Sequence, residues 1–321
     1  MTYTHLTTEE LATIYIFWKK GTKAYKITNA IGRSSETIYK VYRWFNQGNS
    51  ISEYIVEYGR NKRKCGRKSI QLPDEEVKYI NKKVDVGWTP DTIIGRNERT
   101  ISCSMRTLYR KFKRGEFNFS VEKLPMRGKR HPNGFIETRG KRGQLGIDIN
   151  QRYKDYPNYP NEFGHFEGDT IQGKNHKGAV TSLVERISKF EILLNSHDKS
   201  AASINKALSN VLSSMPPHFF KSITFDNGKE FAEWKDIANK YDVNIYFAQV
   251  GAPNQRGLNE NNNGLARRDG LRKDLDFTNL PDEFVKAVAL HRNSIPRKSL
   301  GYKTPLEVFM NYVTAEQLDF F

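Results

Sequence analysis

The sequence predicts a multidomain protein, with a helical and strongly basic N-terminal part and a C-terminal α/β domain built on a mixed sheet. Residues 1–150 contain 30 Lys and Arg against 15 Asp and Glu, whereas residues 151–321 contain 22 against 21. The hydrophobic period also changes, from helical spacing in the first part to strand-like runs alternating with helices in the second. A chain of 321 residues has room for two or three domains.

The charge distribution is the first functional indication. A basic half joined to a nearly neutral half is typical of a polyanion-binding module attached to a second activity; a basic surface without function is the alternative. The two cysteines, Cys65 and Cys103, form no CxxC pair, which argues against a disulfide framework or zinc finger and favours a reducing cytoplasm. No apolar run approaches the ~20 residues of a membrane span, and we expect no membrane partner.

Residues 1–58 are predicted to be a helix-turn-helix DNA-binding domain. Thr7 and Glu10 form a capping-box pattern, a short second helix ends at Gly32, and Ser34 or Ser35 caps a third helix. In this geometry the first turn of the last helix enters the major groove; an ordinary small helical bundle is the alternative. The candidate DNA contacts here are Arg33, Ser34, Ser35, Thr37 and Lys40.

A basic linker is expected at 59–72, either as an arm along DNA phosphates or as a solvated tether. Its candidate contacts are Lys62, Arg63, Lys64 and Arg67. A second helix-turn-helix domain is predicted at 73–118, with Pro90 at a first helical position and Ser102 or Ser104 as a cap. Arg106 and Arg110 are its candidate contacts. Residues 119–160 are rich in Gly, Pro, Arg and Lys and are interpreted as a basic connector, which either follows DNA or is passive.

The remaining segment, 161–321, is expected to form the α/β domain. Strands are predicted at 164–172, 179–187, 190–194, 221–226 and 243–248, with helices starting near 200, 229, 259 and 281. Three strands in succession, followed by strands that alternate with helices, favour a mixed five-stranded sheet flanked by helices.

Three carboxylates stand out in this domain. Asp169 lies in the first strand, Asp226 ends a strand and is followed by an Asn-Gly turn, and Glu260 lies near the start of a helix that Asn259 could cap. Carboxyl ends of strands are where α/β sheets place their sites. A solvent-facing surface charge is the alternative for each, and Glu167 shares the strand face of Asp169.

Four stretches carry a family resemblance: Phe166-Glu-Gly-Asp-Thr170, Thr224-Phe-Asp-Asn-Gly-Lys-Glu-Phe231, Gln255-Arg-Gly-Leu-Asn-Glu-Asn-Asn-Asn-Gly-Leu265 and Pro296-Arg-Lys-Ser-Leu-Gly-Tyr-Lys-Thr-Pro-Leu-Glu-Val-Phe309. Together they resemble the integrase-type DDE transposases of bacterial insertion sequences, most closely the IS-thirty family. Thirty-three residues separate Asp226 from Glu260, which matches that pattern. The resemblance covers most of the chain and implies a ribonuclease-H-like catalytic domain.

The resemblance implies that Asp169, Asp226 and Glu260 are catalytic and hold two Mg²⁺ or Mn²⁺ ions per active site, with Asp169 bridging both. Oxygen ligands suit such hard cations. Water would attack first and free a 3′-OH, which would then attack target DNA. Arg256 and Arg267 are further candidate DNA contacts. Arg267 follows Glu260 by two helical turns on nearly the same face, although a solvated helix charge is an equal alternative.

The sequence therefore predicts a DNA transposase that binds the terminal inverted repeats of an insertion sequence and catalyses metal-dependent strand cleavage and transfer. Its partners would be double-stranded DNA and further copies of itself, as a homodimer or higher oligomer on DNA, in a bacterial cytoplasm. A DNA-binding repressor with an inactive integrase-like domain and a site-specific endonuclease of the same fold are the alternatives. Asp269-Gly-Leu-Arg-Lys-Asp-Leu-Asp-Phe277 departs from the family pattern and leaves reduced activity open.

Overall fold

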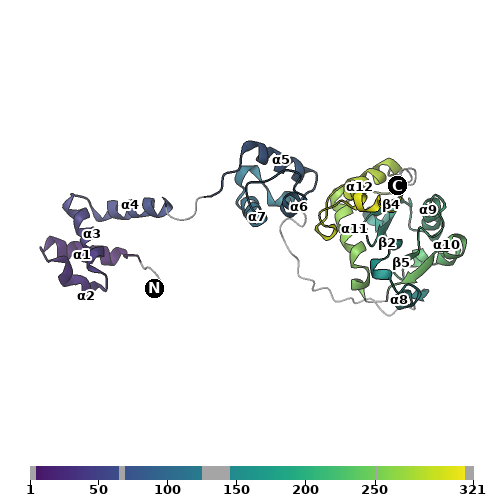
Figure 1. The fold of residues 1–321 in the computed structure, drawn as a ribbon, viewed down its shortest axis with the longest axis horizontal. Coiled ribbons are helices and arrows are strands. Elements are labelled where there is room, and N and C mark those ends of the chain that lie inside the picture. Colours follow the sequence, from purple (N-terminus) through teal and green to yellow (C-terminus); the bar gives the residue numbers. More distant parts are fainter. Residues whose placement is uncertain (1–4, 65–68, 125–144, 250–251, 315–321) are drawn as a thin grey trace. The chain divides into compact units, whose positions relative to one another are not determined.

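The computed structural model describes residues 5–64, 69–124, 145–249 and 252–314, which belong to two compact units, Met1–Gln71 and Leu72–Phe321 (Figure 1). Within these ranges no helix is both long and apolar enough to cross a membrane.

The first unit is a small helical bundle. Its helices are α1 (Thr8–Lys19), α2 (Thr28–Ile31), α3 (Ser35–Asn46) and α4 (Ile51–Lys64). The predicted capping box is present, because the Thr7 side chain accepts from the Glu10 backbone N–H and the Glu10 carboxylate accepts from that of Thr7. Ser34, rather than Ser35, caps α3. The apolar faces of α1 and α3 meet in one buried core.

Helix α4 changes the interpretation of the basic segment at 59–72. The segment begins inside a helix, since α4 continues to Lys64, so the side chains of Lys62, Arg63 and Lys64 project from a regular last turn. All three are exposed. Arg67, the fourth basic candidate of this segment, lies outside the described residues.

The second unit begins with another set of helices, α5 (Asp74–Asp85), α6 (Pro90–Arg96) and α7 (Met105–Arg114). Ser104 caps α7 by accepting from the backbone N–H of Thr107. Ser102, the other candidate cap, donates from its hydroxyl and its backbone N–H to Glu76, at 2.5 and 2.8 Å. This buried bond ties the turn before α7 to α5.

A mixed sheet flanked by helices follows, as predicted, but it has six strands (Figure 1). The strands are β1 (Ile147–Asp148), β2 (His165–Gln172), β3 (Ala179–Glu185), β4 (Glu191–Asn195), β5 (Ser222–Phe225) and β6 (Asn244–Phe247), in the spatial order β1-β6-β5-β2-β3-β4. β2, β3 and β4 pair antiparallel, and the remaining neighbours pair parallel. The unpredicted strand, β1, comes from the segment interpreted as a connector, and two residues are too few to show a strand period.

Helices cover both faces of the sheet. They are α8 (Arg152–Asp155), α9 (Ala201–Ser213), α10 (Trp234–Tyr241), α11 (Gly257–Asp269), α12 (Asp282–Asn293) and α13 (Pro305–Phe309). One core contains Phe166 and Phe225 together with α9 and α10, and the other contains Ile171 with α11 and α12. Because side chains alternate along β2, the strand turns Phe166 toward α9 and Asp169 toward α11.

Gly168 tests this packing. A Cβ at Gly168 would lie 2.2 Å from the ring of Phe225, which stacks on Phe231. We expect Gly168→Ala to lower the free energy of unfolding by about 1–3 kcal/mol, because the buried ring has to shift. Gly264→Ala is the control, since a Cβ at Gly264 meets nothing within 4 Å. Denaturant unfolding that shows equal stability for both variants would contradict the packing.

Candidate active site

The strand register places two of the three predicted carboxylates side by side. β2 and β5 run parallel with Glu167 paired to Thr224. Two residues further along each strand, the same register sets Asp226 beside Asp169. Both side chains point to the α11 face, because two residues restore the same side of a strand. The predicted convergence of these two carboxylates thus follows from strand pairing.

Asp169 is held on both of its carboxylate oxygens. Oδ1 accepts from the backbone N–H of Thr170 at 2.8 Å, and Oδ2 accepts from Nδ2 of Asn263 at 2.9 Å. Burial raises the pKa of Asp169, an effect that the Arg256 guanidinium opposes and the neighbouring charge of Asp226 reinforces. Two adjacent carboxylates in a partly buried place require a compensating cation.

Arg256 provides that cation. Its Nη1 lies 3.6 Å from Oδ2 of Asp169, and its Nη2 lies 3.5 Å from Oδ2 of Asp226. The side chain is only 12 % exposed, and Nη1 has no hydrogen-bond partner. The guanidinium of Arg256 lies between the two carboxylates, and its predicted contact with DNA stays a prediction.

Each residue of the Asp-Asn-Gly turn after β5 makes its own set of contacts. Oδ1 of Asp226 accepts from the Gly228 N–H at 2.9 Å. Asn227 donates to the Ala248 carbonyl at 2.7 Å and accepts from the Leu145 N–H at 2.8 Å, which joins the turn to two other segments. A Cβ at Gly228 would lie 2.4 Å from Oε2 of Glu230 and 2.8 Å from Oδ1 of Asp226, so a larger residue would displace these two carboxylates.

Glu260, the third predicted carboxylate, is exposed in the first turn of α11. Across the described parts of the chain, no three or more His, Cys, Asp or Glu side chains are grouped closely enough to hold a metal ion. Asn263 contacts Asp169 from one turn further along α11, about 60° around the helix from Glu260. The backbone of Glu260 therefore lies on the side of α11 that faces Asp169 and Asp226, but the Glu260 carboxylate is not grouped with theirs.

Asn259 is not the predicted cap of α11. The helix begins at Gly257, so Asn259 lies within its first turn. Its side chain is fully buried, and its backbone N–H donates to Oε2 of Glu167 at 3.2 Å. Glu167, on the same strand face as Asp169, thus holds the start of α11 while Asp169 faces Arg256.

A buried polar network holds the middle of α11. Oδ1 of Asn262 accepts from Arg292 at 3.3 Å and from Arg297 at 2.9 Å. Arg292 also contacts Asp269 at 3.2 Å and Glu191 at 3.5 Å. Burial lowers the pKa of Arg297 to about 10. Arg297 belongs to the fourth family-like stretch, whose role here is to brace the helix that carries Glu260.

Two residues near the carboxylate pair were not singled out in the sequence. Asn263 orients Asp169, as described. Glu230 is buried, accepts from the Thr170 hydroxyl at 3.1 Å and lies 2.9 Å from Nζ of Lys199. Its position four residues after Asp226, within the Phe-Asp-Asn-Gly-Lys-Glu-Phe run, was the available signal.

Arg267 is not a solvated helix charge. Its Nη2 donates to the Gln172 carbonyl at 3.0 Å, and Nη1 is buried without a hydrogen-bond partner. Burial lowers the pKa of Arg267. Arg268, the next residue, pairs with Asp269 at 2.5 and 2.8 Å. Arg267 therefore fastens the second half of α11 to the end of β2.

The helix-turn-helix candidates separate into structural and exposed groups. Arg33 pairs with Glu10 at 2.9 Å and is 19 % exposed, so it joins the turn before α3 to α1. Ser34 and Thr37 share the cap of α3. Ser34 is nevertheless exposed, as are the remaining candidates of these two units, Ser35, Lys40, Arg106 and Arg110.

A mixed sheet of this order, with paired carboxylates at its centre and a helix laid across them, defines the ribonuclease-H-like fold of integrase-type catalytic domains. No protein-family model matches the chain. Among solved structures, the chain is similar to the catalytic core domain of HTLV-2 integrase in complex with magnesium. The two sequences are 19 % identical, and the match covers 45 % of this chain and 94 % of that one, with a TM-score of 0.35.

Among curated proteins, the chain is 30 % identical to the transposase for insertion sequence element IS4351 of Bacteroides fragilis, over 98 % of each chain. It is 29 % identical to transposase InsI for insertion sequence element IS30C of Escherichia coli, over 88 % of this chain and 77 % of that protein. The chain belongs to the IS-thirty (IS30) family of insertion-sequence transposases.

Asn262 tests the brace of α11. We expect Asn262→Ala to lower the free energy of unfolding by about 1–3 kcal/mol, because Arg292 and Arg297 lose a shared acceptor inside the protein. Asn261→Ala, a change at the exposed neighbouring residue, is the control. If thermal unfolding showed the two variants to be equally stable, the network would not hold the helix.

Proposed function

We propose that the chain acts as a DDE transposase, binding the inverted repeats of its element with its N-terminal helical units and cutting and joining DNA with its C-terminal domain. The observation that carries this proposal is the pair Asp169 and Asp226, held side by side by strand register with a cation between them. Paired carboxylates of this kind are suited to phosphodiester chemistry assisted by divalent ions.

The residues present fit such ions. Oxygen-only donors are what Mg²⁺ and Mn²⁺ prefer, and the Arg256 guanidinium marks a position where the fold stabilises positive charge. Asp169, Asp226 and Glu260 would hold two ions per active site. When bound, such ions activate an attacking oxygen and stabilise the leaving oxygen.

The protein's own groups prepare this site. Asn263 and the Thr170 N–H orient the Asp169 carboxylate, and the Gly228 N–H orients that of Asp226. Glu260, exposed in the first turn of α11, would turn its side chain toward the pair to act as the third ligand. Arg256 would then give way to the bound ions and would be available to a DNA phosphate.

DNA binding is proposed for the exposed cations of the helical units. Lys40 and Arg106 lie on the helices α3 and α7, which have the capped N-termini typical of recognition helices. Lys62, Arg63 and Lys64 add positive charge in one turn of α4. Such contacts make affinity fall steeply with salt. Assembly as a homodimer or higher oligomer on DNA stays a prediction.

The three carboxylates are tested by Asp169→Asn, Asp226→Asn and Glu260→Gln. Each variant is expected to abolish cleavage and joining of DNA that carries the element's ends, and to leave end binding intact, because the helical units are unaltered. Gel shift measures binding, and product analysis with Mg²⁺ measures cleavage and joining. Activity in EDTA, or in any one variant, would contradict the mechanism. If the wild-type protein bound the element's ends without cleaving them, a DNA-binding repressor would be favoured. If it cleaved DNA without joining it, a site-specific endonuclease would be favoured.

Arg256 is tested without DNA. Arg256→Ala is expected to lower the melting temperature in EDTA, because two adjacent carboxylates lose their cation. It should also raise affinity for Mn²⁺ by roughly tenfold, about 1.4 kcal/mol, because the guanidinium no longer competes. Calorimetric titration with Mn²⁺ and thermal unfolding measure the two effects. Arg272→Ala, which removes an exposed arginine paired with Asp274, is the control. Unchanged Mn²⁺ affinity in Arg256→Ala would contradict the idea that the Arg256 guanidinium and the metal ions compete for the two carboxylates.

A further inference from the structure

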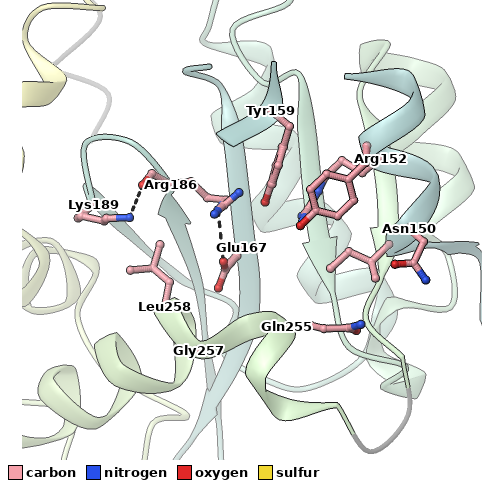
Figure 2. A pocket seen from close by; sticks show the side chains of 11 residues that line it. Asn150, Arg152, Tyr159, Glu167, Arg186, Lys189, Gln255, Gly257 and Leu258 are labelled. Atoms are coloured by element: carbon pink, nitrogen blue, oxygen red, sulfur yellow. Dashed lines mark hydrogen bonds and ion pairs between the residues drawn. The ribbon is translucent and has the colours of Figure 1, made fainter. Parts of the chain in front are cut away.

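A cavity of about 390 Å³ lies against β2 at Glu167 (Figure 2). Its walls come from the segment around α8, from Tyr159, from β2 at Glu167, from the turn between β3 and β4, and from the first residues of α11. It shares β2 and the start of α11 with the active site, since Glu167 precedes Asp169 by two residues on the same strand face. A volume of this size is suited to a small ligand or one unit of a polymer.

Arg152 is the wall residue that points most clearly to a ligand. Its side chain is only 3 % exposed. Nη1 donates to the Thr224 hydroxyl at 2.8 Å, whereas Nε is buried without a hydrogen-bond partner. Burial lowers the pKa of Arg152. A buried guanidinium without a carboxylate on it is costly, and an anionic ligand would compensate that cost.

Two further cations enlarge the positive charge. Arg186 and Lys189 project from the turn between β3 and β4, and Nε of Arg186 lies 3.7 Å from the Glu167 carboxylate (Figure 2). Glu167 is the one carboxylate among the described residues that line the cavity, against three cations. It is also occupied by the Asn259 N–H at the start of α11. The cavity therefore carries a net positive charge.

Tyr159 orders these cations. The Arg152 guanidinium carbon lies 3.5 Å from the centre of its ring, and that of Arg186 lies 4.1 Å away. Figure 2 shows the ring standing between the two side chains. Stacking on an aromatic ring holds a guanidinium's orientation and leaves its N–H groups available for bidentate contact with a phosphate.

The rest of the wall suits a nucleotide better than an isolated anion. Tyr153 lines the cavity and is 54 % exposed, with the Arg152 guanidinium carbon 5.4 Å from the centre of its ring, so the exposed part of the ring can stack on a base. Gly257 and Leu258 bring the N-terminal end of a 13-residue helix to the same wall, and that end favours negative charge. Phosphate-binding groups and an aromatic surface thus occur together.

We propose that this cavity is a subsite for one unpaired nucleotide of the DNA strand that the active site processes. Its phosphate is bound by Arg152, Arg186 and Lys189, and its base stacks on Tyr153. Because the cavity and the carboxylate pair share β2, a nucleotide seated here fixes the strand's position relative to the scissile phosphate. That the nucleotide belongs to a DNA strand processed by the active site rests on the proposed function. That a nucleotide binds here is argued from the residues of the cavity alone.

The test uses the full chain in EDTA and a single-stranded pentadeoxynucleotide with a central 2-aminopurine, so that neither metal nor element ends are needed. We expect saturable quenching of the fluorophore as its base stacks. Tyr153→Leu should abolish the quenching, and Tyr153→Phe should preserve it. Arg152→Lys and Lys189→Ala should each weaken binding by about tenfold. Lys235→Ala, a change at an exposed lysine away from the cavity, should bind as the wild type does.

Competition separates the possible sources of the nucleotide. An unlabelled pentadeoxynucleotide should displace the probe at far lower concentration than dAMP or inorganic phosphate; equal potency of dAMP would overturn the assignment to a DNA strand. Quenching unaltered in Tyr153→Leu and Lys189→Ala, or absent in the folded wild type, would overturn the subsite. Neither result bears on cleavage of element ends, which is assayed separately with Mg²⁺, so failure of the subsite and failure of the transposase proposal are distinguishable.

Discussion

The structure depends on keeping two carboxylates together in a partly buried place. Parallel pairing of β2 with β5 sets Asp226 beside Asp169, and two like charges at this distance repel each other unless a cation or strong hydrogen bonds compensate them. Arg256 provides the charge, and Asn263, Thr170 and the Gly228 N–H provide the hydrogen bonds. The close packing of Gly228 against two carboxylates and the polar face of α11 both belong to this arrangement.

Helix α11 is accordingly positioned by polar contacts more than by apolar packing. Asn259 and Asn262 are fully buried, and Asn263 bonds both to Asp169 and to the Ser182 hydroxyl. Buried amides are directional, so each one fixes the rotation and the axial position of the helix far more closely than an equivalent leucine. If α11 supplies Glu260 to a metal site, as proposed, the helix needs that accuracy.

Features governed by neighbouring residues were predictable from the sequence. The caps at Thr7 and Ser104, the strand ending at Asp226 and the mixed sheet all depend on short-range patterns or on hydrophobic period. The family resemblance is confirmed by relatives that span most of the chain. Asp169 and Asp226 were predicted together and do lie together.

Features that depend on distant pairing were not predictable. A basic residue such as Arg256 is a plausible DNA contact by sequence, and only the fold shows that it meets Asp169 of β2 and Asp226 after β5. The same is true of Arg33, a plausible DNA contact by position that pairs with Glu10 on another helix. Strand β1 exists because β6 offers it a free edge, and two residues carry no signal of that. Local pattern identifies ionisable residues, but their partners are set by tertiary contacts.

Two carboxylates on β2 have different partners, and this difference relates the carboxylate pair to the neighbouring cavity. Glu167 and Asp169 lie on the same face of the strand, yet Glu167 contacts Arg186 and the backbone at the start of α11, while Asp169 faces Arg256 and the charge of Asp226. Glu167 therefore holds the start of α11, whereas Asp169 belongs to the carboxylate pair. Negative charge is thus concentrated at Asp169 and Asp226, and positive charge is concentrated in the cavity that β2 lines at Glu167. On the proposed function, Arg152 and Lys189 would attract a phosphate more strongly than the carboxylate pair, so a DNA strand would be guided to the cavity first. Divalent ions, which reverse the charge at the centre, would then draw the adjacent phosphate in, and this order would couple strand positioning to the loading of the site.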